Sequence, residues 1–165
     1  MEYSIWVVPP EPVYGRLKSI IKNLAGKYRG PTFEPHMTIL GNIEKNLDEI
    51  KEKTSLVASK LNKLKLTLGQ VSFSTTYFQS VFVRVDSTAE LLQINLELKR
   101  QFRMENTVFM PHISLLYGDH DMQTREKVAN EIKMTQSSFT VDKFIVTPVT
   151  QEPDRWKYTM EIPFG

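Results

Sequence analysis

The sequence of 165 residues contains no cysteine. This absence excludes disulfides, thiol nucleophiles and thiolate metal sites, and it argues against a disulfide-stapled secreted scaffold. Glycine-rich phosphate loops are also missing, because the seven glycines are scattered and form neither G-x-G-x-x-G nor G-x-x-x-x-G-K-(S/T). ATP-dependent transfer on those scaffolds is therefore not expected.

Strong charge of either sign and long apolar runs are lacking as well. Twenty-one basic and nineteen acidic residues give a net charge of +2, too balanced for the dense basic stripe of a duplex-binding protein. The longest uncharged stretch, residues 66–83, is interrupted by Thr, Ser, Gln and Gly, and the N-terminus has no export signal. We therefore expect a cytoplasmic monomer that makes no membrane contact.

An internal repeat is the strongest feature that the sequence does contain. The segment that starts at Pro35 reads PHMTILG, and the segment that starts at Pro111, 76 residues later, reads PHISLLYG. Two of the three histidines, His36 and His112, occupy the same place in this repeat.

The same offset relates the predicted helices and strands. Apolar periodicity predicts strands over residues 3–8 and 79–85, and each is followed by a helix. The first helix should span 12–25 and stop at Gly26, and the second should start at Ser87, which would cap it together with Glu90. After the two histidine strands we expect a helix capped by Asn46 and another over about 122–134.

Strands over 64–74 and 139–149 should close the two units, and a slip of the apolar phase predicts a β-bulge in each. The result is one α+β domain in which a βαβαβ unit repeats over residues 3–74 and 79–149, with an additional strand over 155–163. Two such units would be related by a pseudo-twofold axis, so that the histidine strands line their junction. Residues 150–155 are expected to form a hairpin loop, the alternative being a turn over the cleft.

Each histidine strand carries an imidazole and a hydroxyl on one face. Side chains alternate along a strand, so His36 shares a face with Thr38, and His112 shares a face with Ser114. Two imidazoles with an ordinary pKa of ~6.5 can supply a general base and a general acid together near neutral pH. Two hydroxyls can hold the non-bridging oxygens of a phosphate.

Simpler interpretations of the same residues stay open. A duplicated fold could retain a buried, purely structural histidine twice, in which case replacing either residue would impair folding and not turnover. The adjacent Asp119, His120 and Asp121 resemble a metal site, but consecutive side chains diverge and no second cluster completes a ligand set, so we expect no metal. Solvation of a loop is a sufficient explanation for these three residues.

Two H-x-(T/S) strands in a duplicated chain of this size resemble the two-histidine (2H) phosphoesterase superfamily. Further segments are similar to its cyclic phosphodiesterase branch: Tyr3-Ser4-Ile5-Trp6, Gly30-Pro31-Thr32-Phe33, Tyr77-Phe78-Gln79-Ser80-Val81-Phe82, and Met110-Pro111-His112-Ile113-Ser114-Leu115-Leu116-Tyr117. The chain departs from many members of the branch in having no cysteine, so any redox regulation that they support is not expected here.

The resemblance implies a bilobal fold with antiparallel-containing sheets, helices packed outside and a central cleft. It implies that His112 activates water, that His36 protonates the departing ribose oxygen, and that Thr38 and Ser114 hold phosphate oxygens. It also places three aromatic residues around the substrate: Trp6, Phe78 and Tyr117. Strict alternation would turn Tyr117 away from the cleft unless its strand ends before Gly118.

The function implied is cofactor-free and metal-independent hydrolysis of a ribose cyclic phosphodiester to a phosphomonoester, with the 2′-phosphate as the favoured product. The substrate would be a small molecule, a nucleoside 2′,3′-cyclic phosphate or ADP-ribose 1″,2″-cyclic phosphate. One alternative is an enzyme acting on RNA 3′ ends, as a cyclic phosphodiesterase or a 2′-5′ ligase. A second alternative is a nucleotide- or RNA-binding module without turnover.

Overall fold

Two four-stranded antiparallel sheets form the centre of the computed structural model, which describes residues 1–135 and 137–165. The first sheet has the strand order β2-β1-β7-β8, and the second has the order β5-β4-β3-β6. The strands of the first sheet are β1 (Tyr3–Val7), β2 (Met37–Ile43), β7 (Lys143–Pro148) and β8 (Met160–Pro163). Those of the second are β3 (Leu64–Phe73), β4 (Val81–Val85), β5 (His112–Leu116) and β6 (Ser138–Val141). The predicted α+β class is confirmed.

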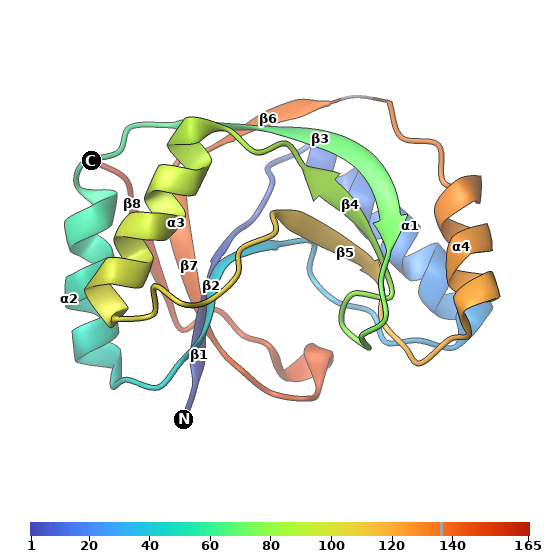
Figure 1. Ribbon diagram of the computed structural model, residues 1–165, viewed down its shortest axis with the longest axis horizontal. Helices are drawn as coiled ribbons and strands as arrows, with labels where there is room; N and C mark the ends of the chain where they lie inside the picture. Colours follow the sequence, from blue (N-terminus) through green and yellow to red (C-terminus); the bar gives the residue numbers. More distant parts are fainter. Residues whose placement is uncertain (136) are drawn as a thin grey trace.

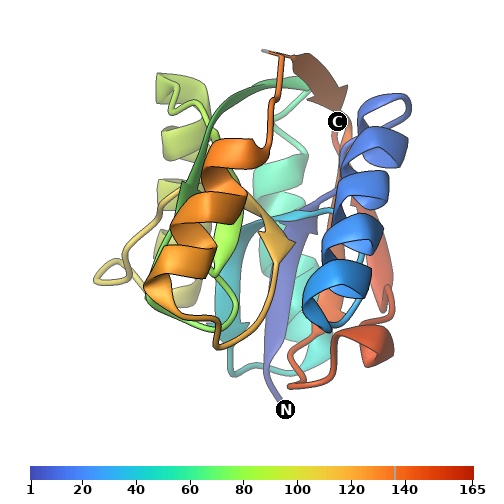
Figure 2. The same ribbon diagram turned by 90° about the vertical axis from the view of Figure 1, so that its right-hand side faces the viewer.

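The four helices lie outside the sheets, as Figures 1 and 2 show. They are α1 (Val13–Tyr28), α2 (Leu47–Ala58), α3 (Ala89–Phe102) and α4 (Met122–Glu131). Helices α2 and α3 stand at one end of the view in Figure 1, and α1 and α4 stand at the other. Helix α2 packs on β8 and α4 packs on β3 and β4, while α1 contacts β5 and α3 contacts β2. Helix α1, which precedes His36 in the chain, therefore contacts the strand that begins at His112, and α3, which precedes His112, contacts the strand that follows His36.

The repeat differs from the prediction in its last strand. Strand β3 ends the first repeat but pairs with β4 in the second sheet, and β7 of the second repeat pairs with β1 in the first sheet. The second sheet is consequently built from one continuous stretch, residues 64–141, and the first sheet from the chain on either side of it.

The slip of apolar phase has a different cause in the two repeats. In β3 the register shifts between Leu68 and Val71, so the predicted bulge is confirmed. The strand predicted over 139–149 is instead two strands, β6 and β7, which belong to different sheets and are separated by Asp142 alone. A bulge was the wrong explanation there: the phase changes because the chain turns from one core-facing surface to another.

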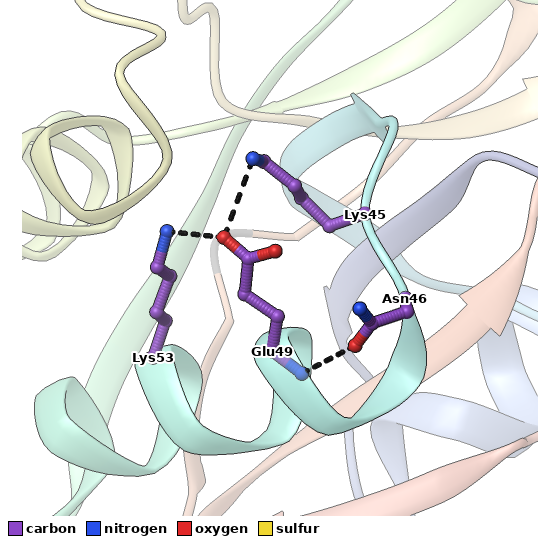
Figure 3. Close-up of polar contacts among 4 residues, drawn as sticks. All are labelled: Lys45, Asn46, Glu49 and Lys53. Atoms are coloured by element: carbon purple, nitrogen blue, oxygen red, sulfur yellow. Dashed lines mark hydrogen bonds and ion pairs between the residues drawn. The ribbon is translucent and has the colours of Figure 1, made fainter.

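The helix ends are set by local caps, which are not always the residues predicted. Asn46 caps α2 as predicted, because its side-chain oxygen accepts a hydrogen bond from the backbone N–H of Glu49 at 2.9 Å (Figure 3). Thr88, and not Ser87, caps α3 by accepting from the N–H of Leu91. Helix α1 continues past Gly26 and ends at Arg29, in the left-handed region with φ 56°.

The last predicted strand is shorter than expected. The predicted strand over 155–163 forms only from Met160 to Pro163: Arg155 belongs to a 3-10 turn over Pro153–Arg155, and residues 156–159 are not part of a strand. The helix predicted over 122–134 likewise ends earlier, at Glu131. No helix in the described part of the chain is long and apolar enough to span a membrane.

Both histidine strands are edge strands. Strand β2 lies at one edge of the first sheet, β5 lies at one edge of the second, and the two are in contact. One carbonyl on the free edge of β2, that of Ile39, accepts a hydrogen bond from the side-chain amide of Asn95 at 2.8 Å. The seam between the sheets thus runs between the two strands that carry the H-x-(T/S) motifs.

Candidate active site

The cleft at this seam brings together all seven residues predicted for the site. It has a volume of about 760 Å³, and its lining includes Trp6, His36, Thr38, Phe78, His112, Ser114 and Tyr117. None of the predicted side chains points into a separate interior. The same cleft is also lined by residues that were not predicted, among them Ser4, Asn95, Lys99 and Trp156.

The two imidazoles are held in the same way. Nδ1 of His36 lies 2.7 Å from the carbonyl oxygen of Glu34, and Nδ1 of His112 lies 2.7 Å from that of Met110. A carbonyl only accepts, so in both rings Nδ1 carries the proton and donates it. Nε2 is therefore the nitrogen that each neutral ring keeps free for a ligand. A proline follows each of these carbonyl residues and favours extended backbone before the strand.

The protein surroundings of both imidazoles favour the neutral form. Burial and, to a smaller extent, the proximity of His112 lower the pKa of His36 to about 4, against the opposing effect of the hydrogen bond to the Glu34 carbonyl. Burial also lowers the pKa of His112, and the charge of Arg84 on the neighbouring strand adds to this effect. The expectation of one neutral and one protonated ring near neutral pH therefore requires a further charge in the cleft.

The two hydroxyls differ in their surroundings. Thr38 is half-buried, and its side chain makes no hydrogen bond to the residues that the structure describes. The Ser114 hydroxyl is buried and donates to the carbonyl of Phe78 at 2.7 Å. To donate to a phosphate oxygen, the Ser114 hydroxyl would have to give up this bond, whereas Thr38 has its proton available.

Aromatic rings surround the histidines. Trp6 stacks on His36 with 3.6 Å between ring centroids, and it is paired with Thr38 across the β1–β2 ladder. Tyr117 stacks on Phe33 at 3.8 Å and meets the edge of Phe78 at 5.0 Å. Strand β5 ends at Leu116, which is why Tyr117 reaches the cleft despite the strand alternation.

Trp156 is the aromatic residue that sequence reasoning missed. Its ring meets Trp6 at 5.5 Å and His36 at 5.6 Å, both edge to face, and its Nε1 donates to the carbonyl of Thr150. Trp156 was expected in the last strand and residues 150–155 were expected to form a plain hairpin loop, but residues 148–151 line the cleft together with Trp156. The clean alternation of residues 156–162 concealed this role, because it resembles a strand throughout.

The third histidine has a structural environment outside the cleft. Nε2 of His120 lies 3.2 Å from the carbonyl oxygen of Tyr28 and donates to it, because a carbonyl only accepts. Asp121 caps α4 by accepting from the N–H of Thr124 at 2.7 Å. Solvation of a loop was thus an incomplete explanation for this tripeptide. Among residues 1–135 and 137–165, no group of three or more His, Asp or Glu side chains is placed to hold a metal ion.

Comparison with known proteins identifies a family. The family model described as "Cyclic phosphodiesterase-like protein" matches residues 1–161. The chain is 29% identical over 137 residues to "Cyclic phosphodiesterase" of Arabidopsis thaliana, covering 82% of this chain and 76% of that protein. It is 23% identical over 155 residues to "2′,3′-cyclic-nucleotide 3′-phosphodiesterase" of Yarrowia lipolytica, covering 87% and 69%.

A similar fold is found among solved structures. The structure of E. coli LigT complexed with 3′-AMP superposes with a TM-score of 0.64 at 16% sequence identity, covering 99% of this chain and 97% of LigT. At this identity the similarity concerns the arrangement of the helices and strands.

Proposed function

Because this chain belongs to the family of cyclic phosphodiesterase-like proteins, we propose that it hydrolyses a ribose cyclic phosphodiester to a phosphomonoester. The observation that carries the proposal is one cleft that holds both imidazoles, with His112 on β5 and His36 directly before β2, the edge strands of two different sheets. The described residues that line this cleft include no Asp and no Glu, although nineteen residues of the chain are acidic. A lining of this composition favours an anionic ligand.

A bound phosphate would supply a negative charge beside the two imidazoles. Burial favours the neutral imidazole in both His36 and His112. A phosphodiester anion beside them favours the protonated form and raises the pKa of the nearer ring. The substrate thereby selects the state in which one ring is an acid and the other a base.

In the reaction one imidazole accepts a proton and the other donates one. The base, His112 by resemblance to the family, takes a proton from water at Nε2 while the water oxygen forms a bond to phosphorus. The bond from phosphorus to the ribose oxygen breaks, and the acid, His36, gives its Nε2 proton to that oxygen. The pair ends with the proton exchanged between its members, and proton transfer through solvent restores the starting state.

The 2′-phosphate is the product we propose. The name of the Yarrowia lipolytica relative specifies a 3′-phosphodiesterase, which breaks the bond to the 3′ oxygen of a 2′,3′-cyclic nucleotide. Thr38 is the better placed of the two hydroxyls to donate to a non-bridging oxygen, and Ser114 would join it after releasing the carbonyl of Phe78. Trp6, Phe78, Tyr117 and Trp156 supply flat surfaces for the nucleoside.

The test is to incubate the purified protein with 2′,3′-cyclic AMP in the presence of EDTA and to separate the products by chromatography. We expect adenosine 2′-phosphate. The substitutions His36→Asn and His112→Asn should each lower kcat by at least ~10²-fold, a typical contribution of general acid–base catalysis, with the circular dichroism spectrum unchanged. His120→Asn, outside the cleft, serves as the matched histidine control and should retain turnover.

Each of the other outcomes would indicate a different function or mechanism for this chain. Binding without turnover by the wild type would indicate a nucleotide-binding module. Loss of folding in both His36→Asn and His112→Asn would indicate that the histidines are structural. Activity that EDTA abolishes would contradict the paired-imidazole mechanism, and turnover restricted to oligoribonucleotides with a cyclic phosphate end would assign the same chemistry to RNA.

A further inference from the structure

A buried lysine forms part of the cleft wall away from the histidines. Lys99 lies in the last turn of α3, is only 8% exposed and is the one Lys or Arg among the described residues that line the cleft. Lysine is rarely buried to this extent without a charged partner, because taking an ammonium out of water is costly.

The charge of Lys99 is incompletely compensated by the protein. Its Nζ donates to the carbonyl of Thr107, which uses one of three N–H groups. Among the ion pairs of the described residues, none involves Lys99. The C-terminal end of α3 provides a partial negative charge, but a helix terminus offsets only a fraction of a full charge.

Three neutral polar residues line the same cleft as Lys99. Asn95 lies one turn earlier on α3, is 4% exposed and lines the cleft, and so do Thr107 and the buried Ser4. Ser4 precedes Trp6 by two residues on β1, so the two side chains share a face of the strand. The Lys99 end and the histidine end are therefore parts of one continuous cleft.

We propose that Lys99 forms a second anion subsite, which binds a phosphate group carried by the substrate in addition to the cyclic phosphodiester. The class of ligand is a nucleotide with a 5′-phosphate or 5′-diphosphate as well as the reacting phosphate. This inference rests on the proposed function, because it assumes that the first phosphate occupies the histidine end. A phosphate at Lys99 supplies the missing negative charge and accepts the N–H groups that Thr107 leaves unused.

Calorimetric titration of product-like ligands tests the subsite without turnover. The probes are adenosine 2′-phosphate, adenosine 2′,5′-bisphosphate and adenosine 2′-phosphate 5′-diphosphate. For the wild type we expect at least one ligand with added phosphate to bind ~10-fold more tightly than adenosine 2′-phosphate, the usual effect of a charge-assisted hydrogen bond. In Lys99→Met this ratio should fall below about 2, and in the control Lys51→Met, at an exposed lysine outside the cleft, it should stay at the wild-type value.

The wild-type measurement alone decides the proposal if Lys99→Met does not fold. Equal affinities of the wild type for all three ligands, or the same ratio in Lys99→Met as in the wild type, would overturn the subsite and leave Lys99 as a tie to the loop at Thr107. Adenosine 5′-diphosphate separates this outcome from a failure of the proposed function. Its binding should weaken in Lys99→Met and persist in His36→Asn, even if the histidine pair proves to bind no phosphate.

Discussion

The burial of a single imidazole couples the stability of this protein to pH. In the folded chain His36 lies between Trp6 and the protein interior with a pKa of about 4, while in the unfolded chain it has the ordinary value near ~6.5. Between these two pH values the unfolded state binds more protons than the folded state. Stability is therefore present above the unfolded value and is lost as pH falls towards the folded value.

We predict that the free energy of unfolding decreases by up to about 3 kcal/mol between pH 7 and pH 4 from this residue, since one pKa unit corresponds to about 1.4 kcal/mol. Urea denaturation of the wild type and of His36→Gln at both pH values measures the effect. The variant should lose less stability on acidification. Equal losses in the two proteins would show that His36 does not titrate as its burial requires.

The site residues that could be located from the sequence are those that belong to the repeated H-x-(T/S) motif. His36 and His112 share a motif, and strand alternation places Thr38 and Ser114 beside them, so the sequence alone assembled one end of the cleft. Lys99 and Trp156 have no counterpart in the repeat. Each reaches the cleft through packing between distant elements, which local periodicity does not encode.

Helix α4 connects to the cleft through one arginine. Arg125 is almost fully buried, and its guanidinium donates to four carbonyls, those of Ser74, Thr76, Gly118 and His120. These carbonyls belong to the two loops that carry Phe78 and Tyr117. The arginine thus fixes the loop between β3 and β4 and the loop after β5 relative to the helix.

We predict that Arg125→Met lowers the free energy of unfolding by about 2–4 kcal/mol, because it leaves buried carbonyls without donors. Urea denaturation measures the change. Arg100→Met on the exposed face of α3 is the matched control and should change stability by less than about 0.5 kcal/mol. A loss in Arg125→Met no larger than in the control would mean that water replaces the guanidinium at little cost.

Helices and strands were predictable where one local signal decides them. The Asn46 cap and the apolar faces of the helices follow from neighbouring residues, and the structure agrees. The exchange of β3 and β7 between the sheets was not predictable, because the apolar pattern specifies which face of a strand is buried but not against which partner. The same limit explains why residues 139–149 were read as one strand.

For the whole molecule, the apolar core is shared between the sheets: one cluster of buried residues contains Ile5 and Val7 of β1 as well as Val81 and Val83 of β4. A shared core of this kind makes unfolding cooperative. We therefore propose that the chain is a single domain whose two sheets unfold together.

The substitution Val83→Ala tests this proposal from one sheet to the other. Removing a fully buried side chain from β4 should destabilise the protein by about 1–3 kcal/mol. Both tryptophans, Trp6 and Trp156, lie outside the second sheet, so their fluorescence should report the same loss as circular dichroism. Val108→Ala, at a side chain 95% exposed, is the control. A fluorescence transition that Val83→Ala leaves unmoved would indicate two independent domains.

The end of the chain lies where the two sheets are joined. The chain passes between them through residues 44–63 and again at Asp142, and the last two residues bond to both passages: the N–H of Phe164 donates to Asp142 and the N–H of Gly165 donates to Ala58. With one intervening residue the Cα atoms of Val141 and Lys143 are at most about 7 Å apart, so β6 and β7 stay together at that point. If the cleft widens for a larger nucleotide, the two sheets must rotate about the connections at residues 44–63 and at Asp142. A bulky group attached to Gly165 would restrict that rotation while leaving every residue that lines the cleft unchanged.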